Sequence, residues 1–206
     1  MCEGFMKKVL LIFLLAVCQF ATRGGVPPCC STNGPASGKV TDKSLYQVQT
    51  EWTSDFGKAM KLEKLRGKPQ VVAMFFTTCE FACPVLVYDV RRIEKELPEN
   101  VRTNVGFVLV SFDSERDTVE VLHAYREKLE LDKERWVLLR GEPEDVLELS
   151  ALLGVKFKKD QRGQFAHSNL ISILNAEGEV VHQQVGLNMS PETSARVIRR
   201  LVEKKK

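Results

Sequence analysis

The sequence predicts one α/β domain built on a central mixed sheet and preceded by an export segment and a linker. Two observations predict this fold class. Apolar runs typical of buried strands alternate with segments of helical period, and a hairpin signature follows late in the chain. The chain has 206 residues, 44% of them apolar, so the domain is large enough to bury a core without disulfide bonds.

The first 21 residues are predicted to be a signal peptide or a membrane anchor. Lys7 and Lys8 precede the apolar run 9–18, which is shorter than the roughly 20 residues that a membrane-spanning helix needs. Two alternatives stay open: cleavage near Cys18 or Ala21, or lipidation, because 15–18 resembles a bacterial lipobox. Either route predicts an exported protein, periplasmic or anchored to a membrane facing the periplasm, where disulfides are permitted.

Residues 22–43 are predicted to form a flexible linker, because they are rich in Gly, Pro, Ser and Thr and have no periodicity. Cys29 and Cys30 lie inside this segment. Adjacent cysteines bond to each other only with strain. The pair therefore favours free thiols, intermolecular bonds or metal binding, and incidental thiols in a tail are the simplest interpretation.

The domain itself is predicted to span 44–206. Residues 44–53 alternate apolar and polar residues, which is typical of a half-buried strand. The near-continuous apolar runs 70–76 and 104–112 indicate strands covered on both faces. The same reasoning predicts strands over 135–139, 170–174 and 180–186 and helices over 84–97, 118–129, 143–153 and 190–202. A β-α-β unit followed by an antiparallel hairpin and a closing helix is the thioredoxin plan.

Cys79 and Cys83 lie where the buried strand 70–76 gives way to a helix, with Pro84 suited to the first helical turn. Open α/β sheets place their ligands at such strand ends. A helix N-terminus favours the thiolate, and residues four apart on a helix share one face. Both sulfurs can therefore meet one partner, either each other as a disulfide or a soft ion such as Cu(I).

His167 is the best candidate for a third ligand. It is predicted to lie in the loop before strand 170–174, which faces the cysteine loop in a thioredoxin plan. Two thiolates and one imidazole would complete a trigonal copper site. His123, on a predicted helix, and His182, on a predicted strand, are not expected to be ligands.

From about Ser44 to Val202 the domain resembles the Sco/SenC family of thioredoxin-like copper proteins. Three matches occur in order: the Cys-x-x-x-Cys-Pro motif at 79–84, the acidic stretch Asp-Ser-Glu-Arg-Asp-Thr at 113–118, and His-Ser at 167–168 before a Gly-containing turn. The sequence departs from the family at Glu80-Phe81, where Pro-Asp is usual, at Ser114 instead of Pro, and at Asn175 in the later turn. The departures leave the three proposed ligands in place and bear on the choice of partner.

The resemblance implies a copper chaperone that binds Cu(I), with Cu(II) as a second state, through Cys79, Cys83 and His167. Asp113 would orient the site through hydrogen bonds. The implied acceptor is the CuA centre of cytochrome c oxidase subunit II or another cuproprotein, and the N-terminus would tether the protein to a membrane.

Three other function classes could use the same cysteines, and the sequence leaves two of them open. A thiol–disulfide oxidoreductase would use Cys79 and Cys83 as a redox pair, with a thiol reductant as partner, and would not need His167. A redox-sensing scaffold domain is a non-catalytic alternative. A peroxiredoxin is disfavoured because Glu80 and Phe76 stand where its motif needs Thr and Pro. With 30 basic and 27 acidic residues, the near-neutral charge disfavours a nucleic-acid partner.

Overall fold

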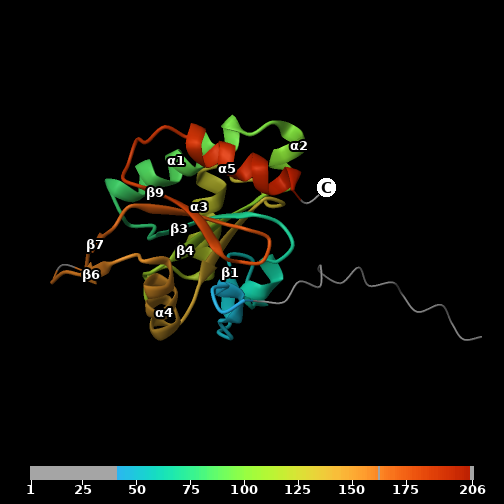
Figure 1. Cartoon of the computed structure of the whole chain (residues 1–206). Coiled ribbons are helices and arrows are strands. Elements are labelled where there is room, and N and C mark those ends of the chain that lie inside the picture. Colours follow the sequence, from blue (N-terminus) through green and yellow to red (C-terminus); the bar gives the residue numbers. More distant parts are fainter. Residues whose placement is uncertain (1–40, 162, 205–206) are drawn as a thin grey trace, which may run out of the picture. The chain divides into compact units, whose positions relative to one another are not determined.

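The computed structural model describes residues 41–161 and 163–204, and a mixed seven-stranded sheet forms its centre (Figure 1). The strand order is β2-β1-β5-β4-β3-β8-β9. The strands are β1 Trp52–Ser54, β2 Ala59–Met60, β3 Gln70–Phe75, β4 Gly106–Ser111, β5 Trp136–Arg140, β8 Leu170–Leu174 and β9 Val180–Val185. A separate two-stranded sheet pairs β6 Phe157–Lys159 with β7 Phe165–His167.

The predicted export segment, most of the predicted linker and the Cys29–Cys30 pair lie outside the described residues. Among the residues that are described, no helix is long and apolar enough to cross a membrane.

The strands at the middle of the sheet are its most buried part. β3 pairs with β4 and β4 with β5 in parallel, whereas β8 runs antiparallel to β3 and β9 antiparallel to β8. Every residue of β3, β4 and β8 is buried. Continuous apolar runs are what a strand needs when both faces of the sheet are covered, and the predicted α/β thioredoxin-like fold is confirmed.

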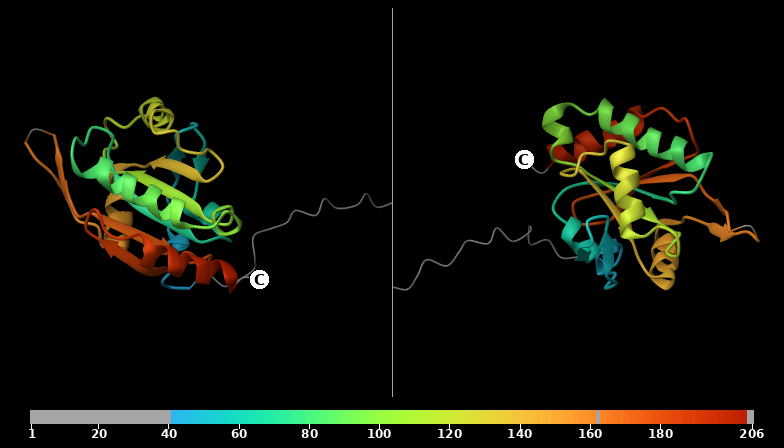
Figure 2. Two further views of the ribbon diagram at one scale, coloured as in Figure 1. Left: turned by 90° about the horizontal axis from the view of Figure 1, so that it is seen from above. Right: turned by 180° about the vertical axis from the view of Figure 1, so that it is seen from behind.

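Helices cover both faces of this sheet. The helices are α1 Ala82–Glu96, α2 Glu99–Arg102, α3 Val119–Lys128, α4 Pro143–Leu153 and α5 Glu192–Glu203. α1 and α5 pack together on one face, and α4 lies on the opposite side (Figures 1 and 2). Sequence signals set the ends of α4, since Pro143 is its first residue and Gly154 closes it with a φ of 71°.

The predicted strand over 44–53 is wrong for most of its length. Leu45–Gln47 forms a 3-10 turn, and strand structure begins only at Trp52. The Ser44 hydroxyl accepts a hydrogen bond from the Tyr46 amide at 3.1 Å and caps the turn. The neighbours Leu45 and Tyr46 are both buried, which does not fit the predicted half-buried strand, because successive side chains of a strand point to opposite faces and one face would be in solvent.

The second difference is the β6–β7 hairpin, which lies where the sequence predicts a loop before strand 170–174. Phe157 pairs with His167 and Lys159 with Phe165 in an antiparallel register. His167 is therefore the last residue of a strand rather than part of a loop. Each strand is only three residues long, and β6 carries two lysines, so neither hydrophobic alternation nor length reveals the hairpin.

A buried ion pair joins α3 to the turn after β1. The side chains of Arg126 and Asp55 are 2% and 0% exposed, and the Arg126 guanidinium donates two hydrogen bonds to the Asp55 carboxylate, with Nη2 3.0 Å from Oδ1. The same guanidinium donates to the carbonyls of Leu131 and Trp136. This pair therefore has the hydrogen-bond partners that a buried charge requires.

Replacing Arg126 with Met should lower the free energy of unfolding by about 3–5 kcal/mol, because Asp55 would remain as a buried, unpaired charge. Guanidinium denaturation at neutral pH measures this change. The control is Arg102→Met, which removes an exposed pair with Glu99 and should leave the unfolding midpoint nearly unchanged. A loss below about 1 kcal/mol in the Arg126 variant would contradict the structural role of the pair.

Candidate metal centre

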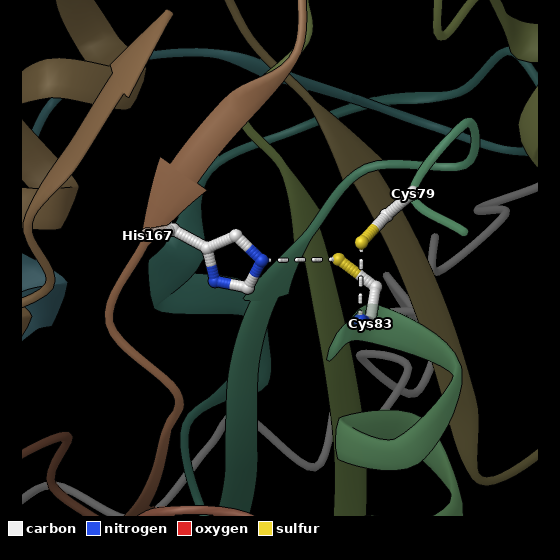
Figure 3. Close-up of side chains that lie close together, drawn as sticks. All are labelled: Cys79, Cys83 and His167. Atoms are coloured by element: carbon white, nitrogen blue, oxygen red, sulfur yellow. Dashed lines mark hydrogen bonds between the residues drawn. The ribbon is translucent and has the colours of Figure 1, made fainter. Parts of the chain in front are cut away.

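Two cysteines lie where β3 leads into α1, and Figure 3 shows them facing one imidazole. β3 ends at Phe75, a short turn follows, and the Cys79 amide donates to the Phe76 carbonyl at 3.4 Å. α1 begins at Ala82, which makes Cys83 the second helical residue. The Cys83 amide, one of the donors that a helix N-terminus leaves unpaired, donates to Cys79 Sγ at 3.2 Å. The predicted strand-to-helix position of the pair is confirmed.

The two thiols differ in their surroundings. Cys83 is 0% exposed, whereas Cys79 is half-buried, and both are free thiols. Burial raises the pKa of the Cys83 thiol, and the neighbouring Cys79 and Asp117 add to this effect. For Cys83, burial thus outweighs the helix N-terminus, so the expected lowering of its pKa is wrong. Without a bound cation this sulfur stays protonated at neutral pH.

His167 presents one ring nitrogen to the cysteines. Its Nδ1 lies 3.1 Å from the Ser168 carbonyl oxygen, and its Nε2 lies 3.4 Å from Cys83 Sγ. A carbonyl oxygen only accepts hydrogen bonds, so Nδ1 carries the proton and Nε2 keeps its lone pair. The backbone thereby selects the tautomer in which Nε2 can bind a metal ion.

The three side chains form a compact donor set. Over residues 41–161 and 163–204, Cys79, Cys83 and His167 are a group whose ligand atoms all lie within 4.8 Å of one another. Aromatic rings enclose the imidazole: the ring centres of Phe112 and Phe76 lie 5.1 and 6.0 Å from that of His167. The chemistry of two sulfurs and one imidazole nitrogen suits a soft ion better than a hard one.

A cavity of about 690 Å³ opens beside this donor set. Cys79 and His167 line it, and among the described residues of its lining the formally charged ones, Glu80 and Asp160, are acidic. Phe81, at the rim, is 81% exposed. The site is therefore reachable from solvent through Cys79 and closed around Cys83.

Asp113, predicted to orient the site by hydrogen bonding, is buried but points elsewhere. Its Oδ2 accepts from Arg116 Nε, and its amide donates to the Ser111 hydroxyl at 3.0 Å. Among its hydrogen bonds in the described chain, none reaches Cys79, Cys83 or His167.

Asp117 is a site-supporting residue that the sequence reasoning missed. Its carboxylate accepts from the Thr77 amide at 3.1 Å and from the hydroxyls of Thr77 and Ser111. These bonds tie the end of β3 to the end of β4. Burial raises the pKa of Asp117 although these hydrogen bonds oppose the shift. Asp117 lies within the motif 113–118, but its contact with Thr77, 40 positions away, has no signal in the sequence.

The other two histidines lie away from the donor set. His123 is on α3, where its ring meets Phe56 edge-on at 5.2 Å. His182 is on β9, opposite Ile173 of β8.

The fold and the donor set define a thioredoxin-like domain with a candidate soft-metal site at the end of its central strand. A family model described as SCO1/SenC matches residues 39–203. The chain belongs to the SCO1/SenC family.

Curated relatives agree with this assignment. A Stutzerimonas stutzeri protein named for copper binding is 26% identical over 136 residues, which cover 64% of this chain and 65% of the relative. The Arabidopsis thaliana mitochondrial protein SCO1 homolog 1 is 27% identical over 128 residues, 62% of this chain and 36% of the relative. The chain thus spans less than two thirds of the length of either relative.

Solved structures share the fold. A SCO1/SenC family lipoprotein from Bacillus anthracis is 28% identical with a TM-score of 0.68, covering 74% of this chain and 92% of the neighbour. Arabidopsis thaliana ScoI, solved with copper bound, is 22% identical with a TM-score of 0.66, covering 75% and 96%. BsSco, a Sco family cytochrome c oxidase assembly protein with a disulfide switch, is 22% identical with a TM-score of 0.64, covering 75% and 90%.

The unequal burial of the two thiols predicts unequal reactivity. In the reduced, metal-free protein at pH 8, iodoacetamide should modify Cys79 at least about tenfold faster than Cys83, because the thiolate is the nucleophile and Cys83 is buried and protonated. Peptide mapping by mass spectrometry separates the two rates. Unfolding the protein in guanidinium should make the rates similar, and equal rates in the folded protein would contradict the described burial.

Proposed function

We propose that this protein binds Cu(I) through Cys79, Cys83 and His167 and passes it to an acceptor protein. The observation that carries the proposal is the convergence of three ligand atoms within 4.8 Å from two parts of the chain. Family membership supports the proposal independently, since a solved neighbour carries copper.

The donor set fits Cu(I) on chemical grounds. Thiolates are soft ligands that select Cu(I), and a neutral imidazole is compatible with them. The Cys83–His167 contact of 3.4 Å is the approach expected of two groups that can share a cation. His167 already exposes the Nε2 lone pair, and the Ser168 carbonyl holds the other ring nitrogen.

The asymmetry of the site favours release as well as binding. Cys79 and His167 line the open cavity, whereas Cys83 lies beneath them. An acceptor sulfur entering the cavity can bond to copper next to Cys79 and His167 while Cys83 still holds it. Copper then moves by stepwise ligand exchange and is not set free in solution.

The proposed acceptor is the CuA centre of cytochrome c oxidase subunit II or another cuproprotein. The description of BsSco as a cytochrome c oxidase assembly protein supports this choice. We also propose that the chain is exported and works in the periplasm or at a membrane surface facing it, on the basis of the charged and apolar start at residues 7–18.

A thiol–disulfide exchange role is the second candidate, and the Cys79–Cys83 pair favours it. Both cysteines are free and adjacent at the helix start. The two thiols would pass two electrons and two protons to the disulfide of a partner protein. Cys79 and Cys83 would then form a disulfide, and the partner would leave with two thiols. This chemistry needs neither copper nor His167, which makes the two functions separable.

Cys79→Ala and Cys83→Ala should each abolish tight Cu(I) binding, because one thiolate and one imidazole cannot hold the ion as firmly. His167→Ala should weaken binding less and leave the exchange of the Cys79–Cys83 disulfide with glutathione unchanged. Anaerobic competition titration of the full chain with a chromophoric Cu(I) chelator measures the affinity. Tight binding that survives in either cysteine variant would overturn the copper proposal. Exchange that depends on His167 would refute the separation of roles.

Copper affinity should rise with pH. Burial raises the pKa of Cys83, so the metal-free thiol is protonated near neutrality and must release its proton when copper binds. Each proton released contributes about a tenfold gain in apparent affinity per pH unit. Anaerobic competition titrations at pH 6, 7 and 8 should therefore show affinity rising at least about tenfold per unit. An affinity that does not change across this range would mean that Cys83 is not a thiolate ligand.

A further inference from the structure

The hairpin that carries His167 is not part of the main sheet. β6 and β7 form their own two-stranded sheet with three residue pairs, and the hairpin projects from the domain (Figure 2). A lone two-stranded hairpin is at best marginally stable in water. The position of His167 relative to the cysteines therefore depends on what fastens this hairpin to the rest of the domain.

Arg116 contacts the hairpin and the domain at the same time. Its Nε donates to Asp113 Oδ2 and its Nη2 donates to the Gly163 carbonyl in the hairpin turn. Its guanidinium carbon lies 6.0 Å from the centre of the Phe165 ring on β7. Gly163 has a φ of 75°, a left-handed backbone conformation that glycine adopts readily, and its carbonyl is the acceptor that faces the guanidinium.

The anchor of this contact is rigid. Asp113 is 1% exposed, and its amide is held by the Ser111 hydroxyl at the end of β4. Arg140 holds the same segment from the other side, because it donates to the carbonyls of Ser114 and Asp117 at 2.8 and 3.1 Å. Arg116 thus projects from a fixed loop.

The other contacts of the hairpin fix its direction less well. Lys159 pairs with Glu115, but these side chains are 39% and 74% exposed, and such surface pairs contribute little. Phe157 stacks on Phe112 with ring centres 5.1 Å apart. Phe165 meets the rings of Phe76 and Phe112 edge-on, each at 5.2 Å. These ring contacts hold the hairpin against the domain but are less directional than the hydrogen bonds of Arg116. The bonds between Lys156 and Ser168 join the two strands to each other and not to the domain.

We propose that Arg116 is a positioning residue for the metal centre: it clamps the β6–β7 hairpin to the loop after β4 and so keeps His167 Nε2 directed at Cys83 Sγ. The proposal rests on the proposed function, since it concerns His167 as a copper ligand. Asp113 then influences the site through Arg116 and the hairpin.

Arg116→Lys is the sharpest test. Lysine keeps the positive charge that pairs with buried Asp113. Its single ammonium group cannot donate to the Asp113 carboxylate and to the Gly163 carbonyl at the same time, as the arginine guanidinium does. Anaerobic Cu(I) competition on the full chain should show about tenfold weaker binding in this variant, in line with the loss of outer contacts around metal ligands. In a His167→Ala background the same substitution should change affinity less than twofold. Arg135→Lys is the matched control. Arg135 pairs with two carboxylates, those of Glu94 and Asp132, but it holds neither the hairpin nor the loop after β4, so this variant should leave copper affinity unchanged.

Two further measurements separate positioning from general stability. In the metal-free protein, Arg116→Lys should speed hydrogen exchange across 157–167 and leave the exchange of α1 unchanged. In the Cu(II)-loaded protein, the nitrogen hyperfine splitting of the electron paramagnetic resonance spectrum should weaken. If Arg116→Lys fails to fold, the neutral double variant D113N/R116M takes its place, because it removes the clamp and leaves no unpaired buried charge.

The outcomes are distinguishable. An equal loss of affinity in the wild-type and His167→Ala backgrounds, or no loss in either, would overturn the clamp. If His167→Ala itself left both copper affinity and the nitrogen splitting unchanged, His167 would not be a ligand, and the proposed function would fail first.

Discussion

The contact between Cys83 Sγ and His167 Nε2 is the constraint on which the candidate site depends. It joins residues 84 positions apart across 3.4 Å, and it holds only if the end of β3 and the β6–β7 hairpin keep their places. Asp117 fixes the end of β3 by hydrogen-bonding both Thr77 and Ser111. The aromatic rings around His167 support the β6–β7 hairpin. The sheet supplies rigidity, and the hairpin supplies the ligand that a bare two-cysteine turn lacks.

Burial divides the work between the two thiols. Cys83 has no exposed surface, so its thiolate is costly without a cation and stable with one. Cys79 faces the cavity together with exposed Phe81 and acidic Glu80, where an acceptor can reach it. Under the proposed function, such a site would hold copper by its inner sulfur and exchange it through its outer ligands. Glu80 and Phe81 are also where this chain departs from the family motif, so the departures lie at the rim that an acceptor would meet.

Much of this could be predicted from the sequence because it rests on local patterns. The continuous apolar runs of β3 and β4, the Pro143 and Gly154 signals of α4, and the cysteine spacing at a helix start all have short-range causes. What escaped prediction is long-range or polar. The Ser44 hydroxyl caps a turn where the sequence predicts a strand, and β6 and β7 lack hydrophobic alternation. Arg116 donates a hydrogen bond to a carbonyl 47 positions away in the sequence. The burial that raises the pKa of Cys83 is likewise a property of the packed core and not of the motif.

Copper K-edge X-ray absorption of the full chain, loaded anaerobically with one equivalent of Cu(I), tests the central claim most directly. We expect three ligands per copper, two sulfurs and one nitrogen with the multiple-scattering pattern of imidazole, and we expect that pattern to be lost in His167→Ala. A first shell of three or four sulfurs would contradict the claim, because Cys29, Cys30 or a second copy of the chain would then supply the ligands in place of His167.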